Sequence, residues 1–148
     1  MASVRSLLRW PLDVGGGGVV VGSPFGARGG RAHDGIDLPA PVGTPVYAAA
    51  DGQVIYAGDG IHGYGNLVVV QHAGDLLTVY AHNSALLVRQ GQWVRSGERV
   101  ALVGQSGRAS GPHLHFEVRQ AQIPTDPVPF LPALSSSALS ASPGGTVP

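Results

Sequence analysis

The chain has 148 residues with nine basic and nine acidic side chains, so its formal net charge is zero. That balance gives no electrostatic reason to expect a nucleic acid or an anionic membrane surface as the partner. The sequence contains no cysteine, which excludes disulfides, cysteine-bound zinc and thiol nucleophiles. With this length and 43% hydrophobic residues, we expect one globular domain.

The two ends of the chain differ from its middle. Residues 1–21 contain only the apolar pair Leu7-Leu8 between Arg5 and Arg9, too short for a signal peptide, and no stretch of the chain reaches the ~20 apolar residues of a membrane span. We therefore expect residues 1–21 to be a lead-in from a longer parent chain. Residues 133–148 are rich in Ser, Ala, Pro and Gly and predict a disordered tail. The folded domain is expected over residues 22–132.

Short apolar runs separated by glycine and proline predict a mostly β domain built on antiparallel sheet. The expected strands cover residues 19–21, 45–49, 52–57, 66–72, 76–82, 99–103 and 113–119. The runs on either side of Ala73-Gly74-Asp75 predict a hairpin. No segment predicts a convincing helix, although residues 84–89 have room for about one helical turn.

Two histidines near the C-terminus lie two residues apart in one of these runs. In a strand, His113 and His115 point to one face while Leu114 and Phe116 point into the core. We interpret the pair as a metal ligand beside a catalytic base. The alternative is a polar strand face exposed to solvent. Glu117 shares the face of the histidines, and either it orients one of them or it is exposed; we leave it out of the catalytic set.

A second pair, His33 and Asp37, lies four residues apart. Gly35 and Pro39 argue against a helix here, so we expect extended chain with the imidazole and the carboxylate facing the same way. Zinc held by three protein ligands keeps a fourth position open, which is the catalytic arrangement. This spacing alone is weak evidence for a metal site. It becomes specific evidence only together with His113 and His115.

The remaining histidines are assigned by context. His82 follows an apolar strand and is counted as functional because the other two clusters need a partner, whereas His72 and His62 are expected to lie outside the site. The glycine-rich loops expected at residues 22–31, 58–66 and 105–112 would rim the metal groove. Arg28, Arg31 and Arg108 in or beside these loops are either contacts for substrate carboxylates or solvated surface residues.

Together these motifs resemble the lysostaphin/LytM-type zinc peptidases, peptidase family M23. The resemblance spans about residues 24–132, in the order of the family's motifs. It is carried by His33-Asp34-Gly35-Ile36-Asp37, Gly43-Thr44-Pro45-Val46, Ala50-Asp51-Gly52, Gly63-Tyr64-Gly65-Asn66, Thr78-Val79-Tyr80-Ala81-His82, Gly91-Gln92-Trp93-Val94 and residues 107–117.

This resemblance implies a role for each site residue. His33, Asp37 and His115 match the three ligands of one Zn²⁺ ion, and His82 and His113 match the two catalytic histidines that do not bind the metal. It also implies an endopeptidase that cuts peptide bonds of bacterial peptidoglycan, in stem cross-links or bridges. We accordingly expect a monomer in the cell envelope, periplasmic or secreted, that binds no nucleic acid.

A second resemblance provides the alternative function. Residues 80–83, 86–92 and 126–132 are similar to the branch of the family that activates cell-wall amidases, whose members typically have degenerate metal sites and act as binding proteins. All five site positions are filled in this chain, which favours the enzyme over an activator with an amidase partner. Residues 88–104 also resemble biotinyl and lipoyl carrier hairpins, but the sequence has no lysine to carry such a cofactor.

Overall fold

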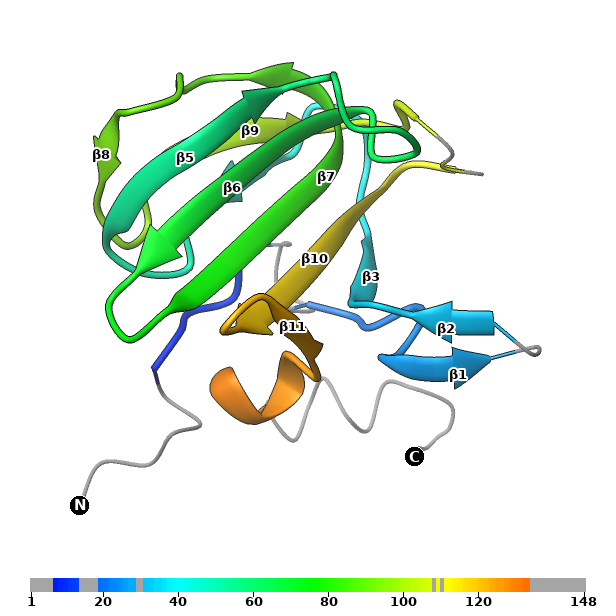
Figure 1. Cartoon of the computed structure of the whole chain (residues 1–148). Helices are drawn as coiled ribbons and strands as arrows, with labels where there is room; N and C mark the ends of the chain where they lie inside the picture. The colour runs from blue at the N-terminus through cyan, green and yellow to red at the C-terminus, as the bar shows by residue number, and fades with distance from the viewer. Residues whose placement is uncertain (1–6, 14–18, 29–30, 108, 110, 134–148) are drawn as a thin grey trace.

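Eleven strands and one short 3-10 helix form the part of the chain described by this computed structural model, which covers residues 7–13, 19–28, 31–107, 109 and 111–133 (Figure 1). The elements are β1 (Gly26–Arg28), β2 (Arg31–His33), β3 (Ile36–Pro39), β4 (Pro45–Tyr47), β5 (Gly52–Gly58), β6 (Asn66–His72), β7 (Leu76–Leu86), β8 (Trp93–Val94), β9 (Arg99–Val103), β10 (His113–Gln120), β11 (Ile123–Thr125) and η2 (Val128–Phe130). The three-residue η2 is far too short to cross a membrane, and no other helix occurs among these residues.

The strands form a nine-stranded antiparallel sheet and a separate β1–β2 hairpin. The sheet runs in the order β11-β10-β7-β6-β5-β8, with β3 also paired to β10 and the β4–β9 pair joined through β7. The β6–β7 hairpin turns at Gly74 and Asp75, which both have positive φ as a tight connection requires. Strand β10 is the one that matters for the site, because it lies between β3 and β7 for part of its length.

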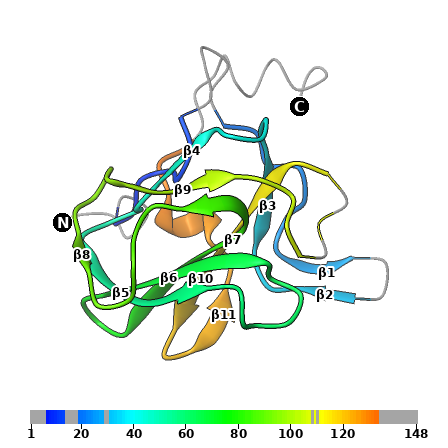
Figure 2. The same ribbon diagram turned by 90° about the horizontal axis from the view of Figure 1, so that it is seen from above.

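Strand β7 has two halves with different neighbours. Its first half pairs with β6 and β10, and its last residues pair with β9 after a shift in register between Asn83 and Ala85. His82 lies at this change of direction with φ +67°, an uncommon backbone conformation for a non-glycine residue. In Figure 2 the β4–β9 pair and the β5–β6 pair accordingly lie on opposite sides of β7.

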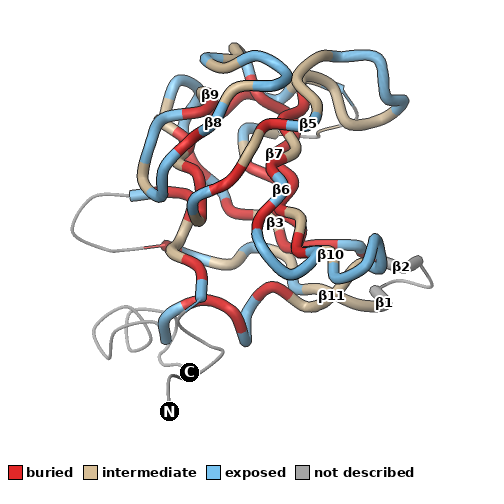
Figure 3. The backbone as a smooth tube through the Cα atoms, turned by 60° about the vertical axis from the view of Figure 1, so that its left-hand side comes forward, coloured by how far each residue is buried: buried red, intermediate tan, exposed pale blue. Residues whose placement is uncertain are grey.

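The hydrophobic core lies between these parts of the sheet, where Figure 3 shows buried residues along the strands and exposed residues in the connecting loops. Tyr80 and Phe116 are fully buried, with ring centroids 5.5 Å apart. The N-terminal segment contributes to the same core through Leu8, Leu12 and Val19. Part of the expected lead-in, residues 1–21, therefore packs with the domain, and nearly all of the expected tail, residues 133–148, lies outside the described residues.

The mostly β antiparallel fold class is confirmed, and the main strands lie where the sequence predicts them. Two local predictions are wrong. Residues 19–21 form no strand, because Val19 packs into the core without a strand partner. Residues 84–89 form no helical turn, because Ser84–Leu86 continue β7 in order to pair with β9.

Candidate active site

The pairing of β10 with β3 and β7 brings the predicted clusters together. Asp37 on β3 lies opposite His115 on β10, and His115 lies opposite Ala81 on β7, so that His82 follows immediately. His33 ends β2 and reaches the same place across a bend at Gly35. All five predicted site residues therefore come to one end of β10, although His33 and Asp37 lie on two strands rather than on one extended segment.

The carboxylate of Asp37 is the centre of this cluster. Its Oδ1 lies 2.9 Å from His115 Nδ1, 3.3 Å from His33 Nε2 and 3.6 Å from His113 Nε2. One ligand atom each from His33, Asp37 and His115 lies within 4.8 Å of the others. Two imidazole nitrogens and one carboxylate oxygen are donors that zinc accepts, and three protein ligands leave a position open. The donor set therefore fits one zinc ion with an open coordination position.

Backbone carbonyls orient three of the imidazole rings. The Nδ1 atoms lie 2.8 Å from Pro24 O in His33, 2.7 Å from Ser106 O in His82 and 2.9 Å from Gly111 O in His113. A carbonyl oxygen only accepts, so Nδ1 carries the hydrogen in each of these rings. The Nε2 atom of each neutral ring is then left with its lone pair, available to a metal or a proton.

His115 is held differently, by carboxylates on both sides. Its Nδ1 lies near Asp37, and its Nε2 lies 2.7 Å from Glu117 Oε2. Burial alone would disfavour the imidazolium, but the two carboxylates outweigh burial and raise the pKa of His115 to about 9. A metal ion at Nδ1 would displace that proton, because a histidine ligand must be deprotonated at the ligating nitrogen.

The electrostatics of the neighbouring groups follow from burial and charge. Burial, reinforced by the nearby His113 and His115, lowers the pKa of His82 in spite of its hydrogen bond to Ser106, so this imidazole is neutral at pH 7. Burial would raise the pKa of Asp37, but the three histidines around it lower the value overall. The rings of His82 and His113 lie 5.1 Å apart between centroids in an edge-to-face arrangement.

Sequence reasoning left Glu117 undecided, and the structure shows it to be fully buried. Besides His115, it accepts a hydrogen bond from the Tyr64 hydroxyl at 2.8 Å and another from Arg119 Nε at 2.7 Å. Burial would raise the pKa of Glu117, but His115 and Arg119 lower it. In the sequence, the available signal for a role of Glu117 was its position on the same strand face as the histidines. The partners that bury it come from elsewhere in the chain.

The remaining sequence-predicted residues lie away from the cluster or outside the described part of the chain. His72 is buried between Asp51 and Thr78, and His62 is exposed in the β5–β6 loop. Residue 108 and the side chains of residues 28 and 31 are outside what the structure describes.

The first expected loop, residues 22–31, is in part a strand, because Gly26–Arg28 pairs with Arg31–His33. The loops at 58–66 and 105–112 do border the site, through Tyr64, Ser106 and Gly111.

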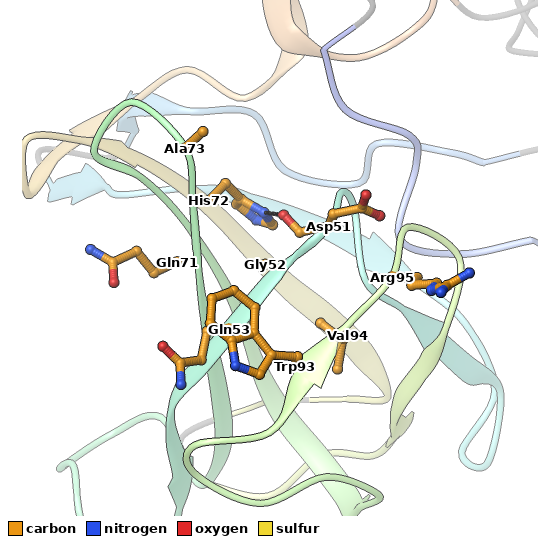
Figure 4. Close-up of a pocket in the computed structure, with 9 residues that line it drawn as sticks. All are labelled: Asp51, Gly52, Gln53, Gln71, His72, Ala73, Trp93, Val94 and Arg95. Carbon is orange, nitrogen blue, oxygen red and sulfur yellow. Dashed lines mark hydrogen bonds between the residues drawn. The ribbon is translucent and has the colours of Figure 1, made fainter.

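A groove of about 560 Å³ lies at the β5–β8 edge of the sheet (Figure 4). Three paired strands cross this groove and place Gln71 of β6, Gln53 of β5 and Trp93 of β8 side by side. Trp93 is 71% exposed. None of the five candidate residues lines this groove. We therefore take the histidine cluster, and not this groove, as the candidate active site.

The sequence profile described as "Peptidase family M23" matches residues 31–127, which contain all five residues of the cluster. The chain belongs to peptidase family M23. Among curated members, it is 41% identical to the murein hydrolase activator NlpD of Escherichia coli over 86% of this chain and 32% of that protein. It is 47% identical to the DD-carboxypeptidase/endopeptidase Mpg of Neisseria meningitidis over 73% of this chain and 26% of that protein.

Solved structures of peptidases share the fold. A zinc-containing peptidase from Vibrio cholerae superposes with a TM-score of 0.73 at 36% identity, over 84% of this chain and 40% of that one. The catalytic domain of lysostaphin from Staphylococcus simulans gives a TM-score of 0.66 at 30% identity, over 75% of this chain and 88% of that one. The expected lysostaphin-type fold is thus confirmed. This M23 chain spans 48% and 22% of the length of two further curated relatives, the lipoprotein YgeR of Escherichia coli and DipM of Caulobacter vibrioides.

Proposed function

We propose that this M23 domain is a zinc-dependent endopeptidase that hydrolyses peptide bonds of bacterial peptidoglycan. The observation that carries the proposal is the convergence of His33, Asp37 and His115, with His82 and His113 beside them. The similarity to the endopeptidase Mpg and to the zinc-containing peptidase of Vibrio cholerae supports it.

In this proposal, His33 Nε2, a carboxylate oxygen of Asp37 and His115 Nδ1 hold one zinc ion. Zinc bound there supplies Lewis-acid polarisation of the scissile carbonyl and activation of water. The hydrogen bonds at the far side of each histidine ring keep the ligating atoms aimed at a common point.

His82 and His113 manage the protons. Hydrolysis consumes one water molecule and one peptide bond and yields a carboxylate and an amine, so one proton must leave the water and one must reach the leaving nitrogen. Each ring has Nδ1 fixed on a backbone carbonyl, so its Nε2 is the atom that exchanges protons. Their Nε2–H groups, once protonated, can also stabilise the oxyanion that develops on the carbonyl. We assign these duties to the pair and not to one member.

Two alanine substitutions test the assignment. His115→Ala should abolish zinc binding. His113→Ala should retain zinc, while hydrolysis of purified peptidoglycan falls by about 100-fold or more, because it removes a proton-transfer group and not a ligand. Zinc content is measured by elemental analysis, and mass spectrometry of the released muropeptides identifies the bond that is cut.

The exposed His62 provides the matched control, since His62→Ala should change neither zinc content nor hydrolysis. Unchanged hydrolysis in both the His113 and His115 variants would rule the mechanism out.

A non-catalytic activator of a cell-wall amidase is the second candidate, because NlpD is a murein hydrolase activator and is 41% identical to this chain. Such a protein would stimulate a partner hydrolase even when His115 and His113 are replaced. Purified chain that takes up no zinc and cuts no peptidoglycan, but activates an amidase, would favour this function. In either case we propose action at the cell envelope, as relatives named lipoproteins suggest. We also propose that the chain is monomeric.

A further inference from the structure

Glu117 is an uncommon side chain, a carboxylate with 0% exposure in a chain of low charge content. A buried carboxylate is costly unless charge and hydrogen bonds compensate it. Here both oxygens are fully engaged. Oε2 accepts from His115 Nε2 at 2.7 Å and from the Tyr64 hydroxyl at 2.8 Å, and Oε1 accepts from Arg119 Nε at 2.7 Å.

All three partners of Glu117 are donors in this arrangement. The Tyr64 hydroxyl donates to Oε2, since an ionised carboxylate has no hydrogen to offer. The Arg119 guanidinium offsets the negative charge. Since Glu117 can only accept, the ring nitrogen that faces it, His115 Nε2, must carry hydrogen. The other nitrogen, Nδ1, is then the only atom of this ring that can lose its hydrogen and offer a lone pair to a metal beside Asp37.

This makes His115 the exception among the site histidines. His33, His82 and His113 are held at Nδ1 by backbone carbonyls and therefore present Nε2, whereas His115 is held at Nε2 and presents Nδ1. No backbone carbonyl is hydrogen-bonded to the His115 ring among the described contacts. Its orientation therefore depends on side chains.

We propose that Glu117, held by Arg119 and Tyr64, is the positioning residue that fixes the His115 tautomer and makes Nδ1 the metal-facing atom. This inference rests on the proposed zinc site. It extends that site to a loop, because Tyr64 lies in the β5–β6 connection and its carbonyl also accepts a hydrogen bond from His82 N at 2.9 Å. Removal of the Tyr64 hydroxyl should therefore weaken metal binding although this hydroxyl is not a ligand.

Glu117→Gln is the sharpest test, because it preserves shape while replacing one acceptor by a donor. Whichever way the amide is turned, its NH₂ group meets a donor from Arg119, Tyr64 or His115. We expect zinc affinity of the full chain, measured by competition with a chromophoric chelator, to fall by about 10- to 100-fold. Imidazole ¹⁵N spectra of the zinc-loaded protein should show Nε2–H on His115 in the wild type and a loss of this single tautomer in the variant.

Tyr64→Phe is the second variant, and it keeps the test valid if Glu117→Gln does not fold. It leaves the carboxylate and Arg119 in place and should reduce zinc affinity on the order of two- to fivefold. Circular dichroism of the metal-free proteins checks folding. The matched controls are Glu98→Gln, at an exposed carboxylate, and Tyr56→Phe, whose hydroxyl contacts Gly60 N; both should bind zinc as the wild type does.

The outcomes separate this inference from the proposed function. A wild-type chain that takes up no zinc would overturn both. Wild-type zinc affinity in Glu117→Gln and Tyr64→Phe, with an unchanged His115 tautomer, would overturn the positioning role alone. Weaker zinc binding in both variants, with both controls unaffected, would support it.

Discussion

At the scale of single residues, the histidines of this chain differ by what holds their second nitrogen. Three of the site histidines, His33, His113 and His115, direct one ring nitrogen towards Asp37 Oδ1. His72 has both nitrogens occupied by other groups, since Nδ1 lies 2.7 Å from Asp51 O and Nε2 lies 2.8 Å from Thr78 Oγ1. In the neutral ring, the Nε2 lone pair of His72 accepts from the Thr78 hydroxyl inside the core, so we interpret His72 as structural.

The hydrogen bonds around His72 predict how stability depends on pH. With His72 neutral, Tyr80 donates to Thr78 and Thr78 donates to Nε2. A protonated ring would instead donate to Thr78, and the hydrogen of either the Thr78 or the Tyr80 hydroxyl would lose its acceptor. Burial accordingly lowers the pKa of His72. The unfolded chain binds this proton first, so the contribution of His72 is complete above its unfolded pKa of 6.5 and is lost as pH falls towards the folded pKa.

We expect the free energy of unfolding to decline below pH 6.5 and His72→Gln to remove part of that decline while lowering stability overall. Urea midpoints over a pH series measure the difference between the two proteins, in which the contributions of the site histidines cancel. His62→Gln serves as the exposed control. A variant with the same pH profile as the wild type would show that His72 is not the group responsible.

At the scale of elements, the site depends on how closely β3 approaches β10. A Cβ at Gly35 would lie 2.3 Å from Phe116 O and 2.8 Å from Glu117 Cγ, a separation that real side chains do not adopt. Glycine at this position therefore allows the chain between His33 and Asp37 to lie against β10, and the pairing places Asp37 opposite His115.

Gly35→Ala should push β3 away from β10. We expect a loss of about 1–3 kcal/mol of stability, because a methyl group is forced into packed backbone, together with strongly reduced zinc uptake, because Asp37 moves away from His115. Chemical denaturation and metal analysis measure the two effects. Gly111→Ala, where an added Cβ meets nothing within 4 Å, is the matched control and should retain both stability and zinc.

At the scale of the whole molecule, the first and last described segments stabilise each other. Leu8 N donates to Phe130 O at 3.0 Å, and Trp10 Nε1 donates to Pro132 O at 3.0 Å. Tyr47 N donates to Pro11 O at 2.7 Å, which ties the same segment to β4. Residues that precede the expected domain boundary at Gly22 are therefore part of its packing.

Two neighbouring leucines test this contribution. Leu8 is 2% exposed and Leu7 is 54% exposed. Leu8→Ala should cost about 2–4 kcal/mol through lost burial and a cavity, while Leu7→Ala should cost less than about 0.5 kcal/mol. Urea denaturation of both variants provides the comparison. Equal stabilities would mean that the N-terminal segment does not contribute to the core in solution.

The sequence by itself determined the features that depend on local pattern. Alternation and turn residues predicted β5, β6, β7, β9 and β10, because long apolar runs bounded by Gly and Asp have few other stable conformations. The spacing of His113 and His115 fixed their common strand face, since the side-chain period of a strand is two. The motif order indicated the family, and the metal and proton-transfer roles remain predictions.

Only the tertiary structure decided what depends on partners distant in the chain. The short strands β1, β2, β3, β8 and β11 exist through pairing and carry too few residues for a recognisable pattern. The burial of Glu117 requires Tyr64, 53 positions earlier, and the packing of Leu8 requires Phe130 from the other end of the domain. The sequence lists the chemical groups, but long-range backbone pairing decides which nitrogen of each histidine is free to act.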